Sequence, residues 1–213
     1  MADKPVLYGF NGSTYVRTVR MVLADKGVDY DQVPVNVLEG EPKREPHLSR
    51  HPFGKVPVLD IDGMRLLETD AICRYLEACH PEPSLVPDDV KDRATMNMAY
   101  GVIDAYGYPA LIGVAGYHLF PDFLGGRDDA AYAEAMKQGE TLLSLVMGWK
   151  GERTWIAGER ASLADYLLAP ILFYVSLTPE TEHERLFAIP GVRAWWEAAQ
   201  GLPNFKPTEP DLG

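Results

Sequence analysis

The first 80 residues alternate short apolar runs with amphipathic segments, a pattern typical of the strands and helices of an α/β unit. Residues 6–8 predict a short buried strand. Residues 14–26 repeat apolar side chains at helical spacing up to Gly27, which predicts a helix that ends there. The β-branched, alternating segment 28–37 predicts a second strand. Strand, helix and strand in this order predict a parallel pair with a right-handed crossover.

A hairpin and another helix follow in the same region. Residues 56–68 form two apolar runs around Asp62-Gly63, a dipeptide that tight two-residue turns favour. Thr69 then stands where a helix N-cap is expected. The helix over 69–79 is expected to carry four side chains inward: Ile72, Cys73, Tyr75 and Leu76.

The rest of the chain has helical patterning. The segment 80–89 carries three prolines and predicts an interdomain linker. Long helices are expected over 90–117 and 128–150. Residues 162–175 are apolar on nearly every side, which predicts a central buried helix. This stretch is too short for a membrane span and carries Asp165 near its start.

Ser162 and Asp165 resemble a capping box at the start of that helix. The predicted architecture is a small α/β domain over 1–79, the linker, and an all-helical domain over 90–213. The proline-rich tail from Leu202 is expected to be an extended wrap.

Charge narrows the range of partners. The 213 residues carry 20 Lys and Arg against 31 Asp and Glu, a formal net charge of −11. Nucleic acids and anionic membranes would repel such a protein, so neither is an expected partner. The first residues have neither the basic flank nor the apolar stretch of a secretion signal, which favours a cytoplasmic location.

Cysteine and histidine spacing excludes some chemistry. Cys73 and Cys79 are six residues apart, about 9 Å along a helix, which is beyond disulfide reach. They are expected to be reduced thiols. The five histidines lack the spacing of metal ligands, so no metal is expected.

Several hydroxyl groups gather at the turn between the first strand and the first helix, in LYGFNGSTYVRT. Tyr8 ends the strand, and Ser13, Thr14 and Tyr15 open the helix. Serine at a helix start is commonly a plain N-cap. The residues alone leave open which of these hydroxyls has a chemical role.

Three stretches resemble the cytosolic glutathione transferases. SRHPFGKVPVLDIDGMRLLETDAICRYLE (49–77) resembles the second half of that family's glutathione-binding domain. STYVRTVRMVLADKGVDYD (13–31) resembles its first helix, and WIAGERASLADYLLAPILFYV (155–175) resembles the signature of its helical domain. The resemblance implies a thioredoxin-like βαβ-ββα domain and an all-helical domain. It also implies conjugation of glutathione, a co-substrate, to small hydrophobic electrophiles without a cofactor.

The resemblance also implies residues that bind glutathione. Val56 and Pro57 match a cis-proline whose preceding backbone pairs with the cysteinyl backbone of glutathione. Periodicity alone also fits a trans proline at a strand edge. Glu68 and Thr69 match the pair that holds the γ-glutamyl end, at a helix start whose free N–H groups can bind a carboxylate. Thr69 also fits a plain N-cap.

Two lysines match family positions that meet the glycyl carboxylate of glutathione. These are Lys43 and Lys55, residues that would otherwise be interpreted as solvated surface charges. Pro42 stands where many serine-type members have a histidine. Contact with the glycyl end is therefore expected to be weaker or differently shared.

The family stabilises the thiolate of glutathione with a hydroxyl. Ser13 matches the catalytic serine of the phi- and theta-like classes, without a gap before Gly27. Tyr8 matches the tyrosine of the alpha, mu and pi classes, with one inserted residue. We expect Ser13 to be catalytic and Tyr8 to be the runner-up. Thr14, Asn11 or no activation remain as further alternatives.

The electrophile pocket is implied by position alone. Phe10, Met98 and Tyr106 are candidates, although such side chains more often pack in a core. A glutathione-dependent isomerase, peroxidase or dehalogenase would use the same glutathione residues. A non-catalytic module for ligand binding or protein interaction is a further alternative.

The resemblance implies a homodimer. The helix over 69–79 and the first long helix would form an isologous two-fold interface. Asp70, Arg74 and Arg93 are expected to be available for pairing across it.

Overall fold

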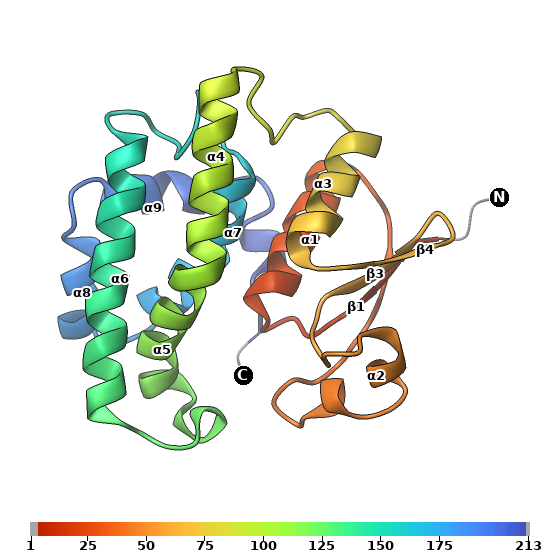
Figure 1. Ribbon diagram of the computed structural model, residues 1–213, viewed down its shortest axis with the longest axis horizontal. Helices are drawn as coiled ribbons and strands as arrows, with labels where there is room; N and C mark the ends of the chain where they lie inside the picture. Colours follow the sequence, from red (N-terminus) through yellow and green to blue (C-terminus); the bar gives the residue numbers. More distant parts are fainter. Residues whose placement is uncertain (1–3, 212–213) are drawn as a thin grey trace. The chain divides into compact units, whose positions relative to one another are not determined.

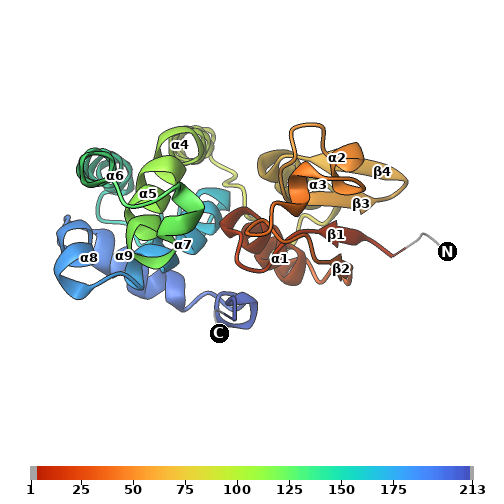
Figure 2. The same ribbon diagram turned by 90° about the horizontal axis from the view of Figure 1, so that it is seen from below.

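The computed structural model describes residues 4–211, which form two compact units (Figure 1, Figure 2). The first unit runs to Ser84 and includes the segment from Pro203 onward, and the second runs from Leu85 to Leu202. The division falls inside the proline-rich segment 80–89. The tail differs from the expected helical domain over 90–213, because residues from Pro203 onward cluster with the first unit.

The first unit is built on a four-stranded sheet with the order β2-β1-β3-β4. β1 is parallel to β2 and antiparallel to β3, and β3 is antiparallel to β4. The predicted βαβ-ββα arrangement is confirmed. The elements are β1 (Val6–Tyr8), α1 (Thr14–Asp25), β2 (Asp31–Val33), η1 (Glu41–Lys43), α2 (His47–Arg50), β3 (Val58–Ile61), β4 (Met64–Leu67), α3 (Thr69–Cys79) and η4 (Lys206–Thr208).

The two faces of this sheet have different roles. Leu7 and Leu59 lie opposite each other in register, and both are fully buried. α1 and α3 pack side by side in this unit (Figure 1), and α1 meets the Leu7 face, where Val16 lies against Gly9. Because side chains alternate along a strand, Tyr8 points to the opposite face.

The hairpin prediction is confirmed, whereas the second strand is shorter than predicted. Asp62 and Gly63 both have a positive φ, 52° and 74°, as the mirror-image two-residue turn requires. β2 covers only Asp31–Val33 instead of 28–37. Pro34 follows directly and has no N–H to donate, so it cannot continue the ladder.

Two predictions about α3 are wrong. Thr69 is the first helical residue, and the N-cap is Glu68 with a φ of 67° and no side-chain capping bond. Tyr75 does not point into the core, because it is half-exposed and its hydroxyl donates to Asp62 Oδ2 at 2.7 Å. The inward positions of Ile72, Cys73 and Leu76 are confirmed.

The C-terminal segment lies along α1. Arg17 is buried, donates from Nη2 to the Phe205 carbonyl at 2.8 Å, and stacks over the Phe205 ring at 4.3 Å. Arg20 donates to the Thr208 carbonyl at 3.1 Å, and Asn204 donates to Asp25. These contacts join the end of the chain to the helix that follows β1.

The second unit is helical, and α7 is its centre. Every α7 residue from Leu163 to Val175 is buried, which confirms the predicted central helix. Among the residues described, no helix is long and apolar enough to cross a membrane. The elements are α4 (Val90–Val102), η2 (Ile103–Gly107), α5 (Tyr108–Leu119), η3 (Pro121–Leu124), α6 (Asp129–Lys150), α7 (Leu163–Ser176), α8 (Glu180–Phe187) and α9 (Val192–Gln200).

The long helix predicted over 90–117 is interrupted. The π-helical segment η2 separates α4 from α5. Pro109 lies in the first turn of α5 and lacks the N–H that would bond to the carbonyl four residues earlier. Such a missing bond is one of the known causes of a break in a helix, so Pro109 accounts for the interruption.

Asp165 joins three parts of the helical unit. It accepts hydrogen bonds from the Ser162 amide and hydroxyl, both at 2.8 Å, which confirms the predicted capping pair. It also accepts from the Ile156 amide at 3.0 Å and from Trp195 Nε1 at 2.8 Å. Burial raises the pKa of this carboxyl, and the four hydrogen bonds oppose that shift.

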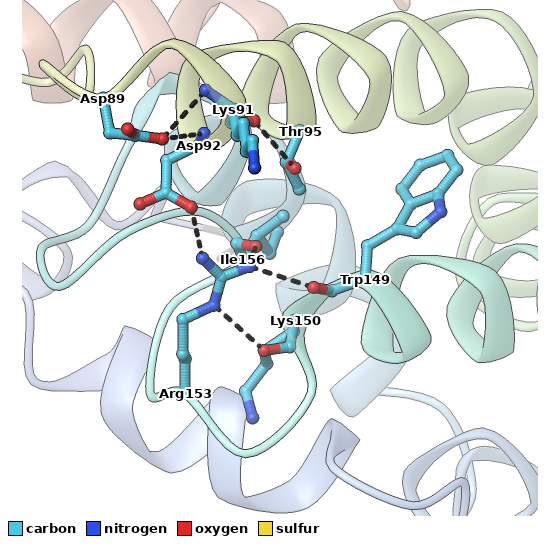
Figure 3. Close-up of polar contacts among 8 residues, drawn as sticks. All are labelled: Asp89, Lys91, Asp92, Thr95, Trp149, Lys150, Arg153 and Ile156. Carbon is cyan, nitrogen blue, oxygen red and sulfur yellow. Dashed lines mark hydrogen bonds and ion pairs between the residues drawn. The ribbon is translucent and has the colours of Figure 1, made fainter.

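Arg153 fixes the loop between α6 and α7 (Figure 3). Its guanidinium pairs with Asp92 Oδ1 near the start of α4, which Asp89 caps through the Lys91 and Asp92 amides. The same guanidinium also donates to three backbone carbonyls of α6 and the loop: Trp149, Lys150 and Ile156. One side chain therefore holds the end of α6 to α4.

Candidate active site

The predicted glutathione residues of the first unit meet at one edge of its sheet. Tyr8, which ends β1, pairs with Val58, which begins β3, and Val58 pairs with Leu67, which ends β4. The segments that continue beyond this edge are therefore the β1–α1 loop, the chain before β3, and the start of α3. They carry Ser13, Val56-Pro57 and Glu68-Thr69.

Ser13 is the N-cap of α1. Its backbone is extended, with φ −77° and ψ 126°, and its carbonyl accepts from the Arg17 amide at 2.9 Å. Its hydroxyl oxygen accepts only a long bond of 3.4 Å from the Val16 amide. Within residues 4–211 this half-exposed hydroxyl donates to no acceptor. Its hydrogen is thus available for an anion at the positive end of the α1 dipole.

The β1–α1 loop is held from β2. Gln32 Nε2 donates to the Gly9 carbonyl at 3.1 Å and to Asn11 Oδ1 at 2.7 Å. The Ser13 amide donates to the Phe10 carbonyl at 2.9 Å. Asn11 is therefore engaged as an acceptor, and the loop backbone that leads to Ser13 is fixed at both ends.

The other hydroxyls are placed less favourably. Tyr8 lies under the Arg50 guanidinium, 4.4 Å from the ring centroid, on the α2 side of the sheet. Its hydroxyl adds to the stronger effect of Arg65 in lowering the pKa of the Asp60 carboxyl. The Thr14 hydroxyl is buried. Ser13 therefore fits an anion at this edge better than Tyr8 or Thr14.

The Val56-Pro57 peptide is cis, as the resemblance implied. Pro57 is buried, and Val56 is half-exposed beside it. The backbone before this pair is anchored by His47, whose Nε2 lies 2.7 Å from the Lys55 carbonyl. The chain that leads to Val56 is thus held next to the start of β3.

Glu68 and Thr69 lie at the start of α3. The Glu68 side chain is 75% exposed, so its carboxylate is available to a ligand cation. Glu68 takes a positive φ, which a non-glycine residue adopts rarely and which is often found at ligand sites. Thr69 is buried, and its amide belongs to the free N–H groups of the first helical turn.

The lysine expectations are only partly matched by the geometry. Lys43 Nζ donates to the Phe53 carbonyl at 2.7 Å, so it is already used to hold its own loop. Lys55 is exposed. Pro42 is buried against Gly54, where an added Cβ would lie 2.6 Å from the Pro42 carbonyl oxygen. Close packing against the backbone of residue 42 thus leaves no room for a side chain at Gly54.

The candidates for the electrophile pocket lie in different units. Phe10 is half-exposed in the β1–α1 loop, and its ring packs over Gly12. Met98 on α4 is 48% exposed, and Tyr106 in η2 is 67% exposed. None of the three is a core residue. Their assignment to the pocket stays a prediction.

Sequence reasoning missed one residue at this edge. His51 is 1% exposed, and its Nε2 lies 3.8 Å from Glu68 Oε1. Burial lowers the pKa of the imidazole, against the opposing effect of Glu68. The signal available was a histidine directly before Pro52, in the segment that leads to Pro57.

Two parts of the chain match known protein families. Residues 7–84 match the family described as "Glutathione S-transferase, N-terminal domain". Residues 107–203 match "Glutathione S-transferase, C-terminal domain". The chain belongs to the glutathione S-transferase family. Membership confirms the predicted fold class and the expectation of a glutathione transferase enzyme.

Individual relatives and structures agree with the family. Glutathione S-transferase 4 of Zea mays is 31% identical over 199 residues, which cover 92% of this chain and 88% of the relative. Maleylacetoacetate isomerase of Rattus norvegicus is 32% identical over 186 residues, with 84% and 83% covered. Glutathione S-transferase I from maize, solved with an atrazine glutathione conjugate, has a TM-score of 0.83 at 27% identity, with 97% of each chain covered.

Proposed function

We propose that this glutathione transferase conjugates glutathione to small hydrophobic electrophiles and that the Ser13 hydroxyl stabilises the attacking thiolate. The observation that carries the proposal is the half-exposed Ser13 hydroxyl at the start of α1, which donates to no acceptor in the described chain. The cis Val56-Pro57 peptide and the exposed Glu68 carboxylate continue from the same sheet edge.

One hydroxyl at a helix start can supply the free energy needed to stabilise the thiolate. Lowering a thiol pKa from about 8.5 by about two pH units requires about 2.7 kcal/mol. A hydrogen bond to a charged group contributes roughly 1.5–3 kcal/mol. A helix N-terminus adds roughly 0.3–1 kcal/mol. Ser13 and the α1 dipole together reach this sum, so no general base is needed.

The remaining parts of glutathione have matching partners. We assign the backbone of Val56 to the cysteinyl backbone, and Glu68 and Thr69 to the γ-glutamyl end. Lys55, with Lys43, would meet the glycyl carboxylate. Glutathione is then a co-substrate, and no cofactor is required. A maize relative was solved with a glutathione conjugate, which supports a glutathione site in this chain.

Calorimetric titration with glutathione, followed by a panel of electrophiles, tests the function. We expect saturable binding and conjugation of at least one aryl halide or epoxide. Absence of glutathione binding would contradict the proposal.

A second activity on the same site is favoured by a specific similarity. The rat relative at 32% identity is named a maleylacetoacetate isomerase. An isomerase would use the same thiolate and return it unchanged at the end of the cycle. Including a cis-diene acid in the electrophile panel separates the two activities, since only isomerisation leaves the glutathione concentration constant.

Glu68 and Thr69 should control affinity rather than thiol chemistry. We expect Glu68→Ala and Thr69→Ala to weaken glutathione binding about tenfold. Glu68→Ala removes the carboxylate and Thr69→Ala the hydroxyl, and we assign each of these groups a contact to a charged end of the ligand worth roughly 1.5 kcal/mol. The thiol pKa should change little, because the proposed contacts lie at the γ-glutamyl end. Titration calorimetry of both variants, with Asp70→Ala as a neighbouring control, measures this. Unchanged affinity in both would remove the two residues from the site.

We further propose that the protein is a homodimer in the cytoplasm. A first domain of this size buries only a modest core, so a partner surface would add to its stability. α3 and α4 are the proposed contact elements. Asp70 and Arg74 are paired with each other within α3, at 2.8 Å, so pairing across the interface would require them to exchange partners. The free thiols of Cys73 and Cys79 fit a reducing compartment.

Sedimentation equilibrium over a dilution series tests the dimer. We expect twice the 23.7 kDa of one chain in physiological salt. The net charge of −11 on each chain should favour dissociation at low ionic strength, where repulsion is least screened. A single 23.7 kDa species at micromolar concentration would contradict the dimer.

A further inference from the structure

A buried imidazole lies beside the exposed carboxylate at the start of α3. His51 is 1% exposed, whereas the Glu68 side chain is 75% exposed. The distance from His51 Nε2 to Glu68 Oε1 is 3.8 Å, too long for a hydrogen bond but within the range of an ion pair if the ring is charged. His51 Nδ1 is buried and has no hydrogen-bond partner in the described chain.

The ring cannot easily move away from Glu68. The His51 amide donates to the His47 carbonyl at 3.0 Å, and the His51 carbonyl accepts from the Gly54 amide at 2.7 Å. The Phe53 ring packs edge-on, 6.2 Å between centroids. Backbone bonds on both sides therefore fix the position of the imidazole, while Glu68 has the freedom of an exposed side chain.

The surroundings of His51 favour its neutral form. Burial is the main cause that lowers its pKa below the ordinary value of 6.5, and His47 and Lys55 lower it further. Glu68 raises it. Protonation consequently takes place only as the pH falls below 6.5, and it creates a cation next to the Glu68 carboxylate.

We propose that His51 is a positioning residue for Glu68 that couples glutathione binding to proton release. The inference rests on the proposed function, in which Glu68 accepts from the ammonium group of the γ-glutamyl end. With a neutral ring, the carboxylate is available to that ammonium group. When the ring takes a proton from solvent, Glu68 pairs with the imidazolium and the ligand loses its partner.

Linkage fixes the direction of the effect. The folded, unliganded site holds a proton on His51 less readily than an ordinary histidine, and a bound ammonium group beside Glu68 makes that proton less favourable still. Binding must then weaken as the pH falls below 6.5, and bound ligand must lower the pKa of His51.

S-methylglutathione is the probe for this coupling, because it has no thiol to titrate. We expect the Kd of the wild-type protein, measured by calorimetry, to rise about five- to tenfold between pH 7.5 and 5.0, within the usual size of coupling between sites. His51→Gln keeps a side-chain amide near the Nε2 position but does not titrate. Its Kd should change by less than about twofold over this range. Glu68→Gln should bind more weakly at every pH and lose the same pH dependence.

The pH dependence of the Kd in the two variants shows whether His51 acts through Glu68 or only supports the fold. If the acid weakening persists in His51→Gln, His51 is not its source and the inference is overturned. If it persists in Glu68→Gln, His51 acts on the fold rather than through Glu68, which also overturns the inference. Absence of binding by the wild-type protein at pH 7.5 would overturn the proposed function together with this inference.

A measurement on the wild-type protein keeps the test independent of folding by the variants. The ring protons of His51 can be identified by NMR through their contacts with Phe53. We expect saturating S-methylglutathione to lower the pKa read from these protons. An unchanged pKa would overturn the inference.

Discussion

Ser13→Ala is expected to lower turnover ten- to a hundredfold with any electrophile that the wild-type enzyme conjugates. The substitution removes a hydrogen bond to the thiolate worth roughly 1.5–3 kcal/mol, and about 1.4 kcal/mol corresponds to a factor of ten in rate. The pH–rate profile should shift to higher pH, because the bound thiol ionises less readily. The KM for glutathione should change less than kcat, since the contact proposed for Ser13 is to the sulfur alone.

Tyr8→Phe is the matched control for this prediction. It removes the other candidate hydroxyl, which helps to lower the pKa of Asp60 and belongs to the ring under Arg50 of α2. We expect turnover and the pH–rate profile to change only slightly. Thermal melting of Ser13→Ala is also needed, because loss of an N-cap costs about 1 kcal/mol of stability. A profile that is unchanged in Ser13→Ala and shifted in Tyr8→Phe would reverse the assignment.

Asp165→Ala should be the most destabilising of the substitutions considered. The carboxylate is fully buried and accepts four hydrogen bonds, from the Ser162 amide and hydroxyl, the Ile156 amide and Trp195. Its removal leaves buried donors unpaired at about 1–3 kcal/mol each, only part of which water can offset. We expect the free energy of unfolding to fall by about 3–5 kcal/mol, as for other broken buried networks.

Asp128→Ala is the control that measures the cost of losing a helix N-cap alone. Asp128 is the exposed N-cap of α6 and accepts from the Ala130 and Ala131 amides. Its loss should cost about 1 kcal/mol. Urea unfolding followed by tryptophan fluorescence measures both variants. Equal losses would show that Asp165 contributes no more than a surface cap.

Patterning predicted the elements whose signals are local. The buried helix α7 follows from its apolar residues on all sides, and its start follows from the Ser162 and Asp165 pair. The hairpin follows from Asp62-Gly63, whose positive φ angles fit the turn. In each case the local preference and the tertiary environment favour the same structure.

The wrong predictions about the tail, β2 and the helix over 90–117 depend on residues distant in sequence or on single prolines. The C-terminal segment belongs with the first unit because Arg17 and Arg20 bind its carbonyls, and no pattern in the tail indicates these partners. Pro34 shortens β2, and Pro109 accounts for the break between α4 and α5. The apolar pattern continues across each proline and therefore predicts an unbroken element, although proline has no N–H to donate.

The sequence predicted which residues make up the candidate site, but not which of them already bind other residues of the chain. Ser13 and Glu68 were singled out by resemblance, and strand register brings their segments to one edge. The contacts of two other candidates were not predictable: Lys43 already bonds to the Phe53 carbonyl, and Tyr8 lies under the Arg50 guanidinium. The buried His51 beside Glu68 was missed because burial of a polar residue in a loop has no periodic signal.

The ionisation of bound glutathione tests the central claim most directly. The thiolate absorbs in the near ultraviolet, so difference spectra of the saturated complex against pH give the pKa of the bound thiol. For the wild-type protein we expect a pKa about two pH units below the ordinary value of about 8.5. For Ser13→Ala we expect a value close to the ordinary one. The same lowered pKa in both proteins would contradict the assignment of Ser13 as the residue that stabilises the thiolate.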